Sequence, residues 1–215
     1  GIKKEEECMY TFEEWKKNLI IVRGGGDIAT GTIYKLYQSR FPVLVLEIAN
    51  PSCIRRTISF CEAVFDKKVE VEGVTAKRAE SLEDAFAIYG QGQIPVMIDE
   101  NGSMIQEVQP PVVVDAILAK RNLGTKITDA PAVIGVGPGF CAGKDVDAVI
   151  ETQRGHNLGR VIYEGEAAPN TGIPGMIGGY AKERVIHASA TGKLHILRQI
   201  GEIVEAGDIL ADIEG

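Results

Sequence analysis

Short apolar runs and segments with helical spacing alternate along the first part of the chain. Residues 19–23 (LIIVR) and 43–48 (VLVLEI) are apolar and β-prone, and residues 32–39 between them carry apolar side chains at the i, i+3, i+4 spacing of a helix. A glycine-rich turn at 24–31 separates the first run from the helical stretch. This order predicts the first βαβ unit of a doubly wound parallel sheet.

The alternation continues to about residue 125. It predicts a helix over 54–65, a hairpin over 68–77 around Gly73, a helix with Ser81 as N-cap, strands at 94–98 and 112–114, and a short helix over 115–122. Residues 1–125 are therefore predicted to form a Rossmann-like α/β domain.

The pattern then changes to short strands separated by glycines. Residues 126–183 predict a glycine-rich β region that completes the site, with a Gly/Pro-rich loop over 166–179. Residues 184–215 look all β, and the pattern I-G-x-x-V-x-x-G-D-x-L-A from Ile200 resembles biotinyl and lipoyl domains. No hairpin matches their modified-lysine motif. We expect a partial barrel-sandwich hybrid. Because half a barrel cannot close, either the fold is cut short at Gly215 or its partner strands come from elsewhere.

Composition and charge narrow the class of protein. Glycine makes up 25 of the 215 residues, above a typical usage of about 7%. The net charge of −7 argues against binding to nucleic acid or an anionic membrane. No apolar run is long enough to span a membrane, and the charged N-terminal segment lacks the apolar core of a signal peptide, so a cytoplasmic location is expected.

The four cysteines form no C-x-x-C pair, so reduced thiols and no metal are expected.

The first glycine turn matches the G-x-G-x-x-A pattern of a dinucleotide-binding turn. Gly24, Gly26 and Ala29 occupy its positions, and Glu47 lies near the end of the next strand, where a carboxylate can bind a ribose diol. The alternative is a tight turn without a ligand, which Asp27 favours because its carboxylate would repel a phosphate. Arg55 and Arg56 follow the second strand, either as phosphate-binding groups or as surface arginines on a helix.

A second glycine cluster spans residues 135–147. A strand followed by G-x-G-P-G can form a rigid nest of backbone N–H groups for an anion. It is not a Walker loop, because Pro138 and Asp145 stand where that motif needs glycine and a hydroxyl. Cys141 is either a nucleophile activated by Lys144 and nearby N–H dipoles or a small, partly buried residue.

Two further positions have the chemistry of acids and bases. Asp115 ends a strand at the expected carboxyl edge of the sheet, as a catalytic carboxylate or an N-cap. His156 lies near Arg154 and Glu151, as an acid–base group or a solvated turn residue. The candidate catalytic residues are Asp115, Lys120, Cys141 and His156, and the candidate cofactor-binding residues are Gly24, Gly26, Asp27, Glu47, Arg55, Arg56, Gly137 and Gly139.

Taken together, the motifs resemble the YqeB-type proteins of selenium-dependent molybdenum hydroxylase systems. The matching stretches run from about Leu19 to the C-terminus: VRGGGDIATG (22–31), IRRT (54–57), AVFD (63–66), VEGVTA (71–76), IPVMID (94–99), VVDAILAKRNLGT (113–125), GPGFCAGKD (137–145), AVIETQRGH (148–156) and NTGIPG (170–175). The resemblance implies an accessory role in maturing molybdenum hydroxylases, by handling or inserting selenium or the molybdenum cofactor. It also implies a client hydroxylase and other maturation proteins as partners, and oligomers are an open possibility.

Other functions stay open on the residues alone. Glu47 also suits an NAD-dependent oxidoreductase, although no Tyr-x-x-x-Lys arrangement is present. A non-enzymatic docking or carrier module is the third possibility. The sequence leaves open whether the protein is an enzyme and whether the ligand is molybdopterin cofactor or an NAD-like dinucleotide.

Overall fold

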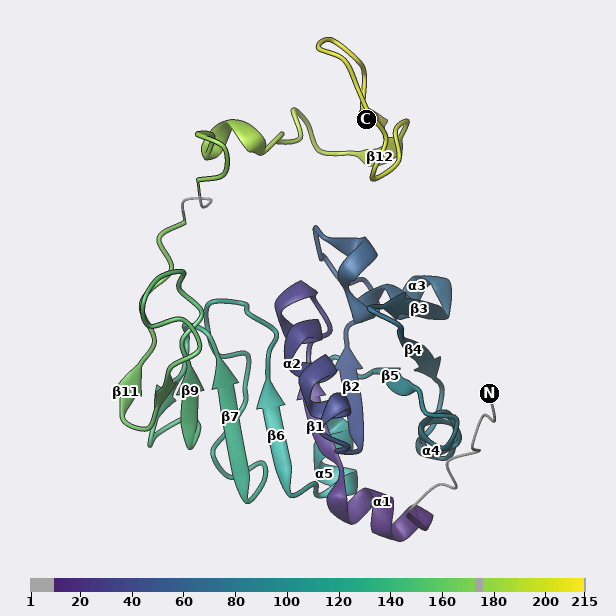
Figure 1. Cartoon of the computed structure of the whole chain (residues 1–215), viewed down its shortest axis with the longest axis vertical. Helices are drawn as coiled ribbons and strands as arrows, with labels where there is room; N and C mark the ends of the chain where they lie inside the picture. Colours follow the sequence, from purple (N-terminus) through teal and green to yellow (C-terminus); the bar gives the residue numbers. More distant parts are fainter. Residues whose placement is uncertain (1–9, 173–175, 215) are drawn as a thin grey trace. The chain divides into compact units, whose positions relative to one another are not determined.

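The computed structural model describes residues 10–172 and 176–214, and the chain divides into two compact units (Figure 1). The first unit is Gly1–Asn170 and the second is Thr171–Gly215. Cys8 and residues 173–175 of the NTGIPG stretch lie outside the described residues. The boundaries at 125 and 183 stay predictions.

A nine-stranded sheet forms the centre of the first unit. Its order is β10-β9-β7-β6-β1-β2-β5-β4-β3. In chain order, these strands are β1 (Ile20–Arg23), β2 (Val43–Glu47), β3 (Lys68–Val71), β4 (Val74–Ala79), β5 (Ile94–Ile98), β6 (Val112–Asp115), β7 (Ala132–Val136), β9 (Ala148–Ile150) and β10 (Val161–Ile162). The edge strands β3 and β10 pair antiparallel with β4 and β9, and the other pairs are parallel. The expected mostly parallel α/β architecture and the 68–77 hairpin are confirmed.

The central strands follow the 3-2-1-4-5-6 order of doubly wound dinucleotide-binding sheets. The order β5-β2-β1-β6-β7-β9 leaves out the β3–β4 hairpin at the edge: β2 and β5 lie on one side of β1, and the chain then returns to place β6 on its other side. Arg23 and Asp115, the last residues of β1 and β6, are register partners at this point of reversal. Ligands of such sheets bind beyond the carboxyl ends of the strands where the order reverses, so a ligand is expected at this edge.

Alternating side chains of the strands build one hydrophobic core on each face of the sheet. In β1, Ile21 packs into one core, while Ile20 and Val22 pack into the other. Helices α1 (Phe12–Asn18), α4 (Leu82–Gly90) and α5 (Ser103–Val108) contribute to the first core, and α2 (Asp27–Gln38), the 3₁₀ turn η2 (Phe60–Glu62) and α3 (Ala63–Asp66) to the second. The Ser81 N-cap of α4 is confirmed, since its side chain accepts a hydrogen bond from the Asp84 N–H at 3.1 Å.

Two expected helices are wrong. The stretch over 54–65 breaks into the 3₁₀ turns η1 (Arg56–Ile58) and η2, followed by the start of the one-turn helix α3. Residues 115–122 contain the end of β6 and no helix. Leu118 and Lys120 adopt left-handed backbone angles, with φ of 58° and 63°, which a right-handed helix cannot accommodate. The crossover from β6 to β7 is therefore irregular chain.

The second unit contains little regular structure. The 3₁₀ turn η3 (Lys182–Arg184) precedes strands β12 (Lys193–Ile196) and β13 (Ala211–Glu214), which pair antiparallel. No residue of this unit within the described part of the chain is buried, and Ile203 is 94% exposed. The barrel-sandwich assignment for this region therefore stays a prediction, with one two-stranded sheet observed.

Candidate functional site at the carboxyl edge of the sheet

The turn between β1 and α2 requires glycine at position 24 and is tightly packed at position 25. Gly24 has a φ of 90°, and a Cβ there would lie 2.9 Å from the carbonyl oxygen of Ala116. A Cβ on Gly25 would lie 3.0 Å from the backbone nitrogen of Cys61. Around Gly26, in contrast, no heavy atom would lie within 4 Å of a Cβ. The turn is thus closely packed at Gly24 and Gly25 and open at Gly26.

The carboxylate of Glu47 holds this turn from the end of β2. Its two oxygens accept hydrogen bonds from the N–H groups of Gly25 and Ile48, each at 2.8 Å. Burial raises the pKa of Glu47 above its usual value, although both backbone donors act in the opposite direction. The carboxylate therefore braces the backbone of the turn, and binding to a ribose stays a prediction.

The start of α2 presents free backbone donors beside a neutralised carboxylate. Gly26 is the N-cap and provides no side-chain cap. The Asp27 carboxylate, whose repulsion of phosphate counted against a ligand, forms an ion pair with Arg55. Arg56 points to a different partner, because its guanidinium hydrogen-bonds Glu62. The two neighbouring arginines therefore do not form a single clamp, and Arg55 is the one at the helix start.

Two cysteines lie in the segment that follows β2, and one of them packs against the glycine turn. The Cys53 sulfur lies 2.9 Å from the Ser59 hydroxyl, which itself donates to the Arg55 carbonyl at 2.7 Å. The backbone N–H of Cys61 donates to the Gly25 carbonyl at 2.8 Å. Burial raises the pKa of the Cys61 thiol well above its usual range, with further contributions from Cys53 and from the charge of Glu47. Cys61 is buried and Cys53 is half-buried.

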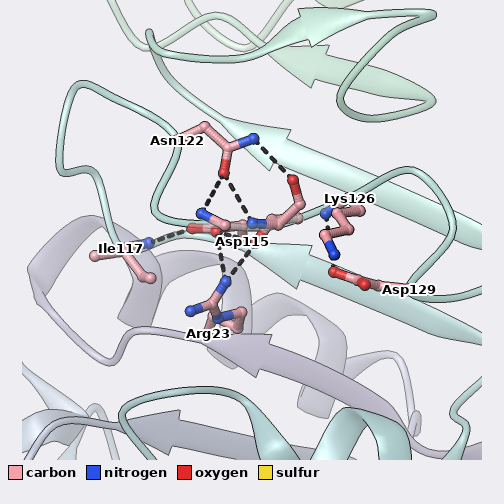
Figure 2. Close-up of polar contacts among 8 residues, drawn as sticks. Arg23, Asp115, Ile117, Asn122, Lys126 and Asp129 are labelled. Atoms are coloured by element: carbon pink, nitrogen blue, oxygen red, sulfur yellow. Dashed lines mark hydrogen bonds and ion pairs between the residues drawn. The ribbon is translucent and has the colours of Figure 1, made fainter.

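A buried polar cluster joins the ends of β1 and β6 (Figure 2). The Thr125 hydroxyl accepts from the Arg23 guanidinium at 2.6 Å and donates to the Asp115 carboxylate at 2.5 Å, while Arg23 and Asp115 form an ion pair at 3.5 Å. The Asn122 side chain shapes the loop that carries Thr125: its Oδ1 accepts from the N–H groups of Gly124 and Thr125, and its amide donates to the Thr125 carbonyl. Arg23, Asp115 and Thr125 are almost fully buried, at 6%, 1% and 2% exposure.

Asp115 is not a helix N-cap, because no helix follows it. Its partners are the residues of this cluster. Its second oxygen accepts a bond from the Ile117 N–H at 3.2 Å, so both carboxylate oxygens have protein partners. Sequence reasoning missed Arg23 and Thr125. One signal in the sequence pointed to this cluster. Arg23 is a charged residue at the end of an apolar strand, and a buried charge needs a partner of opposite charge.

The second glycine loop, after β7, is packed by its neighbours. The Gly137 N–H donates to the Ile150 carbonyl at 2.9 Å, and a Cβ on Gly139 would lie 2.6 Å from the Arg121 backbone. Cys141 begins the two-residue strand β8 (Cys141–Ala142), which pairs with β11 (Gly165–Glu166), and its N–H donates to Asp145. Anion binding by this loop stays a prediction.

The remaining candidate residues are not gathered around Asp115. Lys120 and His156 are exposed and Cys141 is half-buried. Glu151 accepts from the N–H groups of Gln153 and Ala168; burial raises its pKa, but the backbone donors outweigh burial and leave the pKa below its usual value. Across the described ranges, no hydrogen bond or ion pair joins Lys120, Cys141 or His156 to Asp115.

The residues at the edge fit a phosphate better than a metal. Within residues 10–172 and 176–214, no three His, Cys, Asp or Glu side chains come together as metal ligands. The open Gly26 position, the uncapped start of α2 and the Arg55 guanidinium are suited to a phosphate of a nucleotide or pterin. No described helix is long and apolar enough to cross a membrane.

The strand order and the glycine turn place the chain in the class of mostly parallel α/β proteins, with a sheet compatible with a Rossmann-like fold. The chain is 50% identical over 193 residues, 90% of its length, to the uncharacterized protein YqeB of Escherichia coli (strain K12). The resemblance to YqeB-type proteins is therefore confirmed. The match covers 36% of YqeB, so the chain spans about a third of that relative. No family model and no solved structure matches the chain.

Proposed function

We propose that the chain is part of an accessory protein that matures selenium-dependent molybdenum hydroxylases. It handles the molybdenum cofactor or a selenium species on behalf of a client enzyme in the cytoplasm. The proposal is supported by the resemblance of nine ordered motifs to YqeB-type proteins of such systems. The chain spans about a third of the length of YqeB, so the activity of the whole protein is also part of what we propose.

The observation that carries the ligand-binding part is the open start of α2. Gly26 leaves space where Gly24 and Gly25 leave none, and the Asp27 carboxylate is paired with Arg55. A phosphate placed there would meet backbone N–H groups at the positive end of a helix dipole, with Arg55 as a charged donor. Both the molybdopterin cofactor and an NAD-like dinucleotide carry such a phosphate. The site therefore favours a phosphorylated ligand and does not distinguish these two.

The first experiment tests the maturation role in cells. In a strain that lacks the gene, the client hydroxylase should contain less selenium and lose activity, and the full-length protein should restore both. Elemental analysis of the purified hydroxylase measures the selenium. Normal selenium content in the deletion strain would overturn the proposal.

A second experiment tests the phosphate site on purified protein. Arg55→Gln should weaken binding of a phosphorylated pterin or nucleotide by about tenfold or more, because a charge-assisted hydrogen bond contributes about 1.5–3 kcal/mol. Lys68→Gln, on the exposed edge strand β3, is the matched loss of one positive charge and should leave binding unchanged. If the Arg55→Gln and Lys68→Gln variants bind the phosphorylated ligand with equal affinity, Arg55 does not contribute to the phosphate site. Native mass spectrometry of protein from cells supplied with molybdate and selenite would identify the ligand.

A further inference from the structure

We propose that the second unit is an interface between two copies of this chain, which pack face to face through the apolar side of the β12–β13 sheet. The proposal goes beyond the maturation role and does not depend on it. The surface concerned is apolar, large for a single chain and complementary to an identical surface.

The register of β12 and β13 collects apolar side chains on one face of their sheet. Leu194 lies opposite Ile213, and Ile196 lies opposite Ala211. Residues directly opposite each other in an antiparallel pair project from the same face, and alternate residues of one strand share that face. Leu194 and Ile196 are nevertheless 58% and 54% exposed. An apolar sheet face is normally buried against a second layer, so this sheet lacks its second layer in a single copy.

The other face of the same sheet is polar. Lys193 lies opposite Glu214, and His195 lies opposite Asp212. The His195 Nε2 atom is 3.0 Å from the Glu214 carboxylate, so two of these side chains are already paired. Such a face is suited to water, and the apolar face is therefore the one that needs a partner.

The connection between the two strands adds to the apolar surface. It carries five large apolar side chains that are at least 40% exposed: Leu197, Ile200, Ile203, Val204 and Ile209. Together with the two in β12, and at on the order of 100 Å² of apolar surface for each side chain, they present about 700 Å². The largest apolar patch of a typical monomer is about 300–600 Å². Each partner in a stable complex buries about 800 Å², so the exposed surface is close to what one side of a dimer needs.

A second copy is an occupant that the chain itself supplies. In the first unit, the two faces of the nine-stranded sheet are already covered, one by each hydrophobic core. The β12–β13 face of another copy presents the same apolar side chains, and a two-fold axis sets identical surfaces against each other. In this packing both polar faces point to water, and the four strands form a two-layer sandwich.

Charge disfavours the alternative, in which two copies join edge to edge through β13. An antiparallel pair of β13 strands centred on Ile213 would set Asp212 of one copy opposite Glu214 of the other. Like charges directly opposite each other destabilise a strand pair. The contact therefore uses the apolar face of the sheet.

Sedimentation equilibrium of the whole chain tests the proposal. The mass should rise from one chain to two as the concentration increases. Leu194→Gln should raise the dissociation constant at least about tenfold, because the two-fold axis removes an apolar anchor from both copies. The matched control is His195→Gln, which places the same residue one position along, on the polar face, and should leave the dissociation constant unchanged.

A second measurement needs no variant. Isotope-labelled and unlabelled chains are mixed and cross-linked through their lysines, and mass spectrometry identifies the peptides that join two copies. We expect links between copies at Lys182 and Lys193, the lysines of the second unit. At dilutions where single copies prevail, these links should disappear and the amides of β12 and β13 should exchange rapidly.

Four results would overturn the proposal. The chain may sediment as a monomer at every concentration, Leu194→Gln and His195→Gln may weaken the dimer equally, or links between copies may be confined to the first unit. The fourth is a monomeric full-length protein in which β12 and β13 are as protected from hydrogen exchange as β1, because another segment of the polypeptide then covers the face. None of these results bears on selenium content in the deletion strain, so this inference and the maturation role fail separately.

Discussion

Replacing Asp115 with asparagine keeps the shape of the side chain and removes its charge from the buried cluster. Arg23 is 6% exposed and ion-paired to Asp115, so the substitution leaves a guanidinium buried without its counter-charge. Removing one partner of a buried pair costs about 3–5 kcal/mol. We take the lower end, about 3 kcal/mol, because Thr125 still accepts a bond from Arg23 at 2.6 Å.

Urea unfolding followed by circular dichroism measures this change. With a slope of about 2 kcal/mol per molar urea, a loss of 3 kcal/mol lowers the midpoint by about 1.5 M. Glu13→Gln is the matched control, because it breaks the exposed Glu13–Lys16 pair at 2.8 Å in α1. Its effect should stay within about 0.5 kcal/mol and should vanish at high salt, whereas the Asp115→Asn effect should persist.

A double-mutant cycle tests whether the cluster acts as one unit. Arg23→Met alone leaves Asp115 buried without its counter-charge, so the double variant Arg23→Met/Asp115→Asn should lose less stability than the two single losses combined, by about 1–3 kcal/mol. Additive losses, or a loss below about 1 kcal/mol for Asp115→Asn, would refute the argument that these buried charges depend on each other.

Three other outcomes follow from contacts described above. The raised pKa of Glu47 means that the folded state holds this proton more tightly than the unfolded chain, so its contribution to stability is full below the ordinary value of 4.5 and is lost as the pH rises through the folded pKa. Glu47→Gln should remove that fall in stability from urea titrations across this window, and an unchanged pH slope would contradict the assignment. Gly139→Ala should cost about 3 kcal/mol or more by thermal unfolding, since its Cβ would lie 2.6 Å from the Arg121 backbone, against about 1 kcal/mol for Gly143→Ala, which meets no atom within 4 Å at a similarly left-handed φ. In hydrogen exchange, the amides of β12 and β13 should exchange far faster than those of β1, because a two-stranded sheet without buried side chains is marginal; equal protection would show that additional structure covers them.

The first half of the sheet could be predicted because its signals are local. An apolar run, a glycine turn and a helical stretch specify β1, α2 and β2, and the Ser81 cap specifies where α4 begins. The break at 54–65 could not be predicted in the same way. Its apolar residues have helical spacing, but the Thr30 hydroxyl binds the Phe60 N–H and the Gly25 carbonyl binds the Cys61 N–H, which hold this segment in 3₁₀ turns by contacts distant in sequence.

In the candidate site, too, the local features could be predicted and the contacts between distant residues could not. The glycine turn and Glu47 could be found from their spacing, and the structure adds the contact between them. The place of Arg23 in the cluster could not be found, because Arg23 lies 92 positions from Asp115 and 102 positions from Thr125. Only the return of the chain to place β6 beside β1 brings them together.

The irregular crossover from β6 to β7 has a consequence for how this protein tolerates mutation. A helix distributes its stability over a ladder of backbone bonds, so most of its exposed positions accept many residues. The loop at 116–131 has no such ladder, and its course near the site depends on the side chains of Asn122 and Thr125. Sensitivity to substitution should therefore be concentrated at a few separate positions, such as Asn122, Thr125 and the buried Ala116, while exposed neighbours such as Leu123 vary freely. A saturation-mutagenesis map of this segment would show isolated sensitive positions in place of the three- to four-residue periodicity of a helix.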